Sequence, residues 1–114
     1  MHELALAEEV LDIAQRQAAE HSLSRIDTIK LRIGALSCVE PEALRWALES
    51  TLQGTLAENA DIELQITPGE GECGSCGHTF AVTELPTPCP ACQHWQTRIT
   101  AGQEMVVQQL AGIE

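Results

Sequence analysis

The chain has 114 residues, a formal net charge of −11 and only 3% aromatic residues. This length is enough for one domain with a small inserted module, and the negative charge repels nucleic acid phosphates and anionic membrane surfaces, so we expect neither as a partner. No apolar run reaches the roughly 18 residues of a membrane helix, and no signal-peptide pattern opens the chain, so we expect a cytoplasmic protein.

The first half of the chain predicts two helices separated by a strand. Residues 4–20 and the residues after Glu40-Pro41 repeat apolar residues at helical spacing, and a proline in the first turn favours a helix start there. The expected inner faces are Leu4, Ala7, Val10, Leu11, Ala14 and Ala18 in the first helix, and Leu44, Ala47, Leu48, Thr51 and Leu52 in the second. Between them, apolar residues alternate with Lys30 and Arg32, which predicts a half-buried strand ending at Gly34. Ile26 is out of phase with this alternation, so we expect a bulge at the start of that strand.

The second half predicts two more strands, at residues 61–67 and 104–113, with a different kind of segment between them. Residues 68–98 hold four of the five cysteines and four of the five prolines, without a helical period. The expected fold is α+β, with two helices on a small, about three-stranded antiparallel sheet and an inserted zinc-ribbon lobe. The expected domains are residues 1–67 plus 99–114, and residues 68–98. With so few aromatics, we expect aliphatic residues to form the core around Trp46, Phe80 and Trp95.

Two C-x-x-C pairs separated by twelve residues have the spacing of a zinc ribbon. Their members are Cys73, Cys76, Cys89 and Cys92. Four thiolates favour tetrahedral Zn(II) and leave no open position for water, which argues against a catalytic zinc. Gly77 supplies the conformational freedom that such a turn needs. His78 and His94 are either solvated turn residues or alternative ligands, and we expect the isolated Cys38 to be a small core residue.

The chain opens with Met1, His2 and Glu3, directly before the first helix. The Met1 amine, the deprotonated backbone nitrogen of His2 and the His2 imidazole Nδ1 can close two fused chelate rings around one metal. Three nearly coplanar nitrogens favour square-planar Ni(II) or Cu(II), and Glu3 could add a fourth donor. The alternative is a solvated terminus, with Glu3 placed favourably beside a helix N-terminus.

The MHELAL start, LRIGALSCVEPEAL in the middle and the paired cysteines together resemble the HypA/HybF family of hydrogenase maturation proteins. The resemblance implies a nickel metallochaperone that delivers Ni(II) to the large subunit of [NiFe]-hydrogenase with a GTPase partner, HypB, and that carries a structural zinc. It places the nickel site on Met1, His2 and Glu3. The family often has an aspartate where this chain has Glu40, so we expect Glu40 to support His2 rather than to bind nickel directly.

Two other classes of protein fit parts of the sequence. A zinc-ribbon adaptor without a nickel role would need the cysteine lobe but not His2. A hydrolytic zinc enzyme would need an open metal site, whereas the chain has no H-E-x-x-H motif and no Ser/His/Asp set, so we expect no enzyme. The sequence leaves open whether the protein is a monomer or a homodimer.

Overall fold

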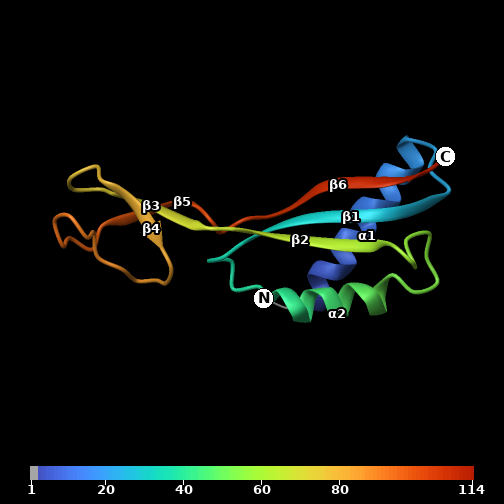
Figure 1. Cartoon of the computed structure of the whole chain (residues 1–114), viewed down its shortest axis with the longest axis horizontal. Coiled ribbons are helices and arrows are strands. Elements are labelled where there is room, and N and C mark those ends of the chain that lie inside the picture. Colours follow the sequence, from blue (N-terminus) through green and yellow to red (C-terminus); the bar gives the residue numbers. More distant parts are fainter. Residues whose placement is uncertain (1–2) are drawn as a thin grey trace.

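The computed structural model describes residues 3–114 and is elongated, with extents of 54 × 24 × 17 Å. One end holds both helices and three strands, and the other end holds the remaining three strands (Figure 1). The elements in chain order are α1 (Glu3–Glu20), β1 (Arg25–Gly34), α2 (Pro41–Thr51), β2 (Asp61–Thr67), β3 (Gly69–Cys73), β4 (Thr79–Val82), β5 (Thr97–Ala101) and β6 (Met105–Ile113). Within this described range, no helix is long and apolar enough to cross a bilayer.

The larger end contains a three-stranded sheet with the order β2-β1-β6. The two helices and the three strands are as predicted, but the sheet is mixed. β6 runs antiparallel to β1, whereas β2 runs parallel to β1, with Leu31 beside Leu64. The expectation of a wholly antiparallel sheet is therefore wrong for the β1–β2 pair. The reason is connectivity: α2 returns the chain to the end of the sheet where β1 began, and such a crossover makes the two strands parallel.

The bulge predicted at the start of β1 is present. The β1–β6 register shifts between Ile26 and Thr28, and it shifts again between Lys30 and Leu31. The first shift turns Ile26 inward, where its side chain is only 1% exposed. The sequence predicts this bulge because Ile26 is apolar at a position where the alternation of apolar and polar residues in the strand calls for a polar one.

Both helices cover the same face of the sheet. Their apolar residues form one core cluster with Ile29, Leu31 and Ile33 of β1. In α1 the predicted face is confirmed for Ala7, Val10, Ala14 and Ala18, which are all buried.

Leu4, by contrast, is 57% exposed, and Leu6 is buried in its place. At 3.6 residues per turn, Leu4 lies about 100° from the centre of the buried face, so it falls outside the contact with the sheet.

The core is aliphatic, as expected, but it is not built around tryptophan. Trp46 is 75% exposed and Trp95 is 64% exposed, so the prediction that they organise the core is wrong. Trp46 lies in α2, whose buried residues are Leu44, Ala47 and Leu48. A residue two positions after Leu44 is about 200° away around the helix and therefore faces outward.

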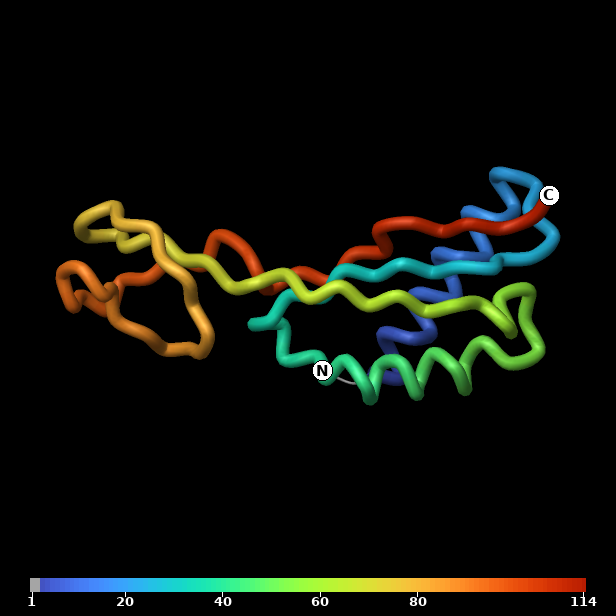
Figure 2. Tube along the Cα trace, in the orientation of Figure 1, coloured from blue at the N-terminus to red at the C-terminus, as the bar shows by residue number. Residues whose placement is uncertain are grey.

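The second sheet, of order β4-β3-β5, is antiparallel and lies at the other end of the molecule. Two chain segments connect the ends, as the tube in Figure 2 shows. The end of β1 lies so close to the segment between β5 and β6 that a Cβ on Gly34 would clash with the Gly102 carbonyl oxygen. The Leu36 amide also donates to that carbonyl at 2.7 Å. The predicted domain boundaries remain a proposal, and β5 continues to Ala101, beyond the predicted boundary at residue 98.

Candidate metal centres

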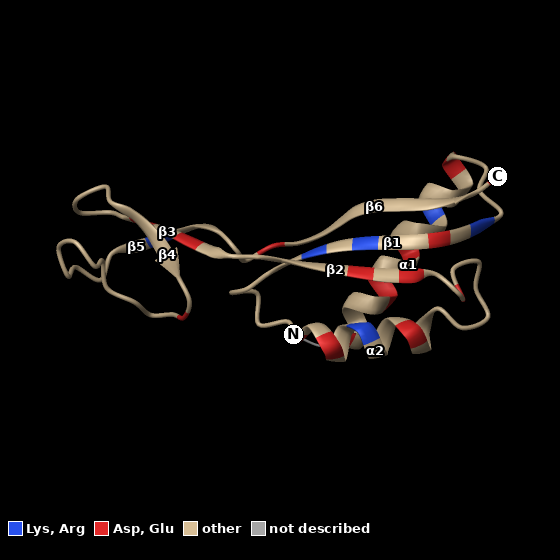
Figure 3. Cartoon of the chain, in the orientation of Figure 1, with Lys and Arg blue, Asp and Glu red and all other residues tan. Residues whose placement is uncertain are grey.

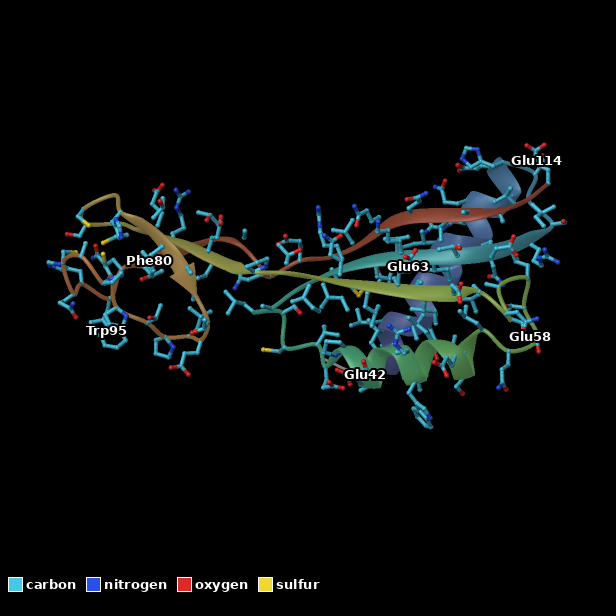
Figure 4. All side chains as sticks on the ribbon, in the orientation of Figure 1. Glu42, Glu58, Glu63, Phe80, Trp95 and Glu114 are labelled. Atoms are coloured by element: carbon cyan, nitrogen blue, oxygen red, sulfur yellow. The ribbon has the colours of Figure 1, made fainter. Side chains whose placement is uncertain are left out.

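The four cysteines of the paired motifs converge in the smaller lobe, the part that carries the labelled residues Phe80 and Trp95 in Figure 4. The four sulfur atoms lie within 4.8 Å of one another. The Sγ atoms of Cys73 and Cys92 are 3.5 Å apart, and those of Cys76 and Cys89 are 3.7 Å apart. Tetrahedral Zn–S bonds of about 2.3 Å place sulfur atoms about 3.8 Å apart, so the spacing suits a zinc ion.

The two C-x-x-C turns have the same backbone geometry. The Gly77 amide donates to the Cys73 carbonyl at 2.9 Å, and the Gln93 amide donates to the Cys89 carbonyl at 2.8 Å. The residue after each pair has a positive φ, 77° at Gly77 and 68° at Gln93. The sequence indicated Gly77 but not Gln93, because a glutamine carries no local signal for a left-handed backbone.

The electrostatics of the cluster favour a bound cation. The amides of Cys76 and Ser75 donate to the Cys73 sulfur at 3.4 and 3.3 Å and lower the pKa of Cys73 to about 6. Although the His94 amide acts to lower the pKa of Cys92, burial and the neighbouring thiols outweigh it and raise that pKa to about 12. Four thiolates this close repel one another, and a divalent metal ion would remove that repulsion.

The remaining candidates in the described residues lie outside the four-sulfur cluster. The His78 ring stacks on Phe80, with centroids 5.9 Å apart. His94 is exposed. Cys38 is also exposed and has a φ of 64°, so the expectation of a core residue is wrong: it occupies a left-handed turn before α2 rather than a strand or helix face.

The candidate nickel residues lie partly outside the described residues. Nothing is described for Met1 and His2, whereas Glu3 is the first residue of α1 and Glu40 is the N-cap of α2. The Glu40 amide donates to the Glu3 carboxylate at 3.5 Å, and the Ala43 amide donates to the Glu40 carboxylate at 2.6 Å. The structure therefore brings Glu3 to the start of α2 and uses one oxygen of Glu40 as a helix cap.

Loss of this helix cap is expected to lower the stability of the protein. Changing Glu40 to alanine removes the acceptor for the Ala43 amide, and we expect the free energy of unfolding to fall by about 1 kcal/mol. Glu40→Asp keeps an acceptor at the N-cap and should stay close to the parent. Urea denaturation of both variants with their metal content matched tests this, and an unchanged midpoint for Glu40→Ala would show that the cap contributes nothing.

The fold and the site together define a two-lobed metal-binding protein, with an α/β lobe and a lobe organised by four cysteines. The chain belongs to the HypA family, because residues 1–112 match the family model described as hydrogenase/urease nickel incorporation, metallochaperone. It is therefore a maturation factor of the metallochaperone kind and not an enzyme.

Relatives with known names match almost the whole chain. The hydrogenase maturation factor HypA of Dechloromonas aromatica is 41% identical over 110 residues, which are 96% of this chain and 97% of the relative. The protein of the same name from Geobacter sulfurreducens is 40% identical with the same coverage.

Solved structures agree with the fold. The solution structure of the Ni metallochaperone HypA from Helicobacter pylori superposes with a TM-score of 0.73, and the match covers 99% of this chain and 98% of that one. At 23% identity, this likeness supports the fold alone. A second solution structure, of a HypA protein, has a TM-score of 0.69 at 25% identity, with 99% and 97% coverage.

Proposed function

We propose that this protein binds Ni(II) at its N-terminus and delivers it during [NiFe]-hydrogenase maturation. Family membership over residues 1–112 carries the proposal. The position of Glu3 adds support, since its carboxylate lies at the junction of the two helix starts and Glu3 directly follows Met1 and His2 in the sequence.

The proposed nickel ligands are the Met1 amine, the His2 amide nitrogen and imidazole Nδ1, and Glu3. The three nitrogens suit a square-planar ion, and the Glu3 carboxylate adds negative charge close to it. Glu40 has a supporting role in this scheme. Its carboxylate holds the first turn of α2, and its amide donates to Glu3, which fixes the position of that carboxylate.

The proposed zinc ligands are Cys73, Cys76, Cys89 and Cys92. A site with four sulfur ligands is closed, so the ion would stabilise the lobe without taking part in a reaction. The proposed partners follow from the family resemblance: the HypB GTPase, and the hydrogenase large subunit as the recipient of nickel. An exposed nickel site with an exchangeable carboxylate suits a protein that must release its metal.

Nickel affinity should depend on His2 and on pH. Nickel binds the neutral imidazole and the deprotonated amide, so protons compete with it, and we expect affinity to fall steeply below about pH 6.5, the ordinary pKa of histidine. Isothermal titration of zinc-loaded protein with Ni(II) between pH 8 and pH 5 measures this effect.

His2→Ala should abolish the site, and His21→Ala, at the opposite end of α1, is the matched control. If His2→Ala lost nickel binding but still supported hydrogenase maturation as the parent does, the protein would be a zinc-ribbon adaptor without a nickel role. If the nickel affinity stayed the same from pH 8 to pH 5, the proposed ligands would be excluded.

A further inference from the structure

β6 is an edge strand without the usual protection. It lies at the end of the β2-β1-β6 sheet, so its outer edge pairs with no other described strand. Edge strands normally carry charged residues or proline, which prevent pairing with other chains. The nine residues of β6, MVVQQLAGI, include neither, and the strand has no acidic or basic residue along its length in Figure 3. Its free edge is therefore open to another strand.

A groove runs beside this edge, between β6 and α1. It consists of two adjoining hollows of about 450 Å³ and 240 Å³, which share Ile13 and Val107. Its apolar walls are Leu6, Ile13, Leu23, Met105, Val107 and Leu110. Residues of α1 and β6 line the groove together, and the apolar residues of β6 are only partly buried.

The strand register shows that the apolar side chains of β6 lie on the same side of the sheet as the groove. Met105, Val107 and Leu110 of β6 lie opposite Ile33, Leu31 and Ile29 of β1, which are buried beneath the helices. These β6 residues therefore face the helix side of the sheet. In a strand added beside β6, alternate side chains would point to the same side and enter the groove.

We propose that β6 and the groove bind an extended segment of a partner protein, which adds a fourth strand to the sheet and places alternate apolar side chains against α1. This is recognition by strand addition, in which main-chain hydrogen bonds supply affinity and the groove supplies specificity. None of the residues that line the groove is a proposed nickel ligand, so the proposal goes beyond the proposed function.

Charge identifies the kind of segment that fits. Glu9 lines the groove, and Glu104 and Glu114 stand immediately before and after β6. Among the residues described as lining the two hollows there is no lysine or arginine. A segment with basic residues flanking its apolar stretch would therefore complement the site.

A second copy of this chain fits less well. Each copy has a formal net charge of −11. Antiparallel pairing of two β6 strands centred on Gln109 would place Glu104 of one copy opposite Glu114 of the other, and like charges directly opposite each other destabilise a strand pair.

Synthetic peptides can test the site on the full-length, zinc-loaded protein. The probe is KVTVTVTVK, which has alternating valines and basic ends. One control peptide, EVTVTVTVE, reverses the end charges, and another has the probe sequence with N-methyl groups along one edge, which removes hydrogen-bond donors. Fluorescence anisotropy measures binding, and hydrogen exchange of the amides of residues 105–113 locates it.

We expect KVTVTVTVK to bind and to slow exchange in β6, and both control peptides to bind at least about tenfold more weakly, ~1.4 kcal/mol. Ile13→Glu should weaken binding by a similar factor, because it places a carboxylate in the apolar groove. Ile66→Glu is the matched control, since Ile66 is also partly exposed but lies on β2.

Three results would overturn the proposal. The first is equal binding by parent and Ile13→Glu, and the second is equal binding of the N-methylated peptide. The third is sedimentation of the free protein as a dimer that Ile13→Glu dissociates, because the occupant would then be a second copy of the chain.

Discussion

Replacing Cys73 with serine is expected to remove zinc and unfold the smaller lobe. The strands of that lobe have only five, four and five residues, and its buried apolar side chains in the described structure are Cys73, Val82 and Cys89. The cysteine cluster is thus most of the lobe's core. A structural zinc contributes roughly 10–16 kcal/mol of apparent binding free energy, more than such a small core can replace.

Metal analysis by mass spectrometry and amide NMR spectra measure both parts of this effect. We expect zinc to fall from one ion per chain to a trace, and the signals of residues 69–101 to lose their dispersion while those of α1 and β1 persist. Cys38→Ser is the control, because that exposed thiol lies outside the cluster. Native zinc content in Cys73→Ser would contradict the assignment of four sulfur ligands.

Adding two residues before Met1 is expected to abolish the planar nickel site. In the extended chain, the nitrogen of Met1 is an amide rather than a free amine, and the fused chelate rings that end on His2 cannot form in the same way. We expect nickel affinity to fall by roughly a hundredfold, ~2.7 kcal/mol. The absorption bands of planar Ni(II) should disappear during titration.

The matched control carries the same two residues after Glu114, at the opposite end of the chain. It should bind one nickel ion with parental affinity, and both extended proteins should retain zinc, because the cysteine lobe is unaltered. Equal nickel affinity and equal spectra in the two extended proteins would remove the N-terminal amine from the ligand set.

Features that depend on local chemistry could be predicted from the order of the amino acids. Helical periodicity predicted α1, and Glu40-Pro41 marked the start of α2, because a capping acceptor and a first-turn proline act within a few residues. The alternation of apolar and polar residues predicted β2, and the break in that alternation at Ile26 predicted the bulge in β1. The spacing of the cysteines predicted their convergence for the same reason, since each C-x-x-C pair is organised by its own turn.

Features that depend on which elements become neighbours can be seen only in the folded molecule. Periodicity cannot show that β2 joins β1 in parallel, that Trp46 stays exposed or that Glu3 reaches the amide of Glu40. Nor can it show that β6 is an edge strand beside a groove, because that requires knowing the strand order and where α1 lies relative to β6. Local signals act over one or two turns, whereas these arrangements arise from contacts between residues far apart in the chain, where burial of the whole core selects one packing.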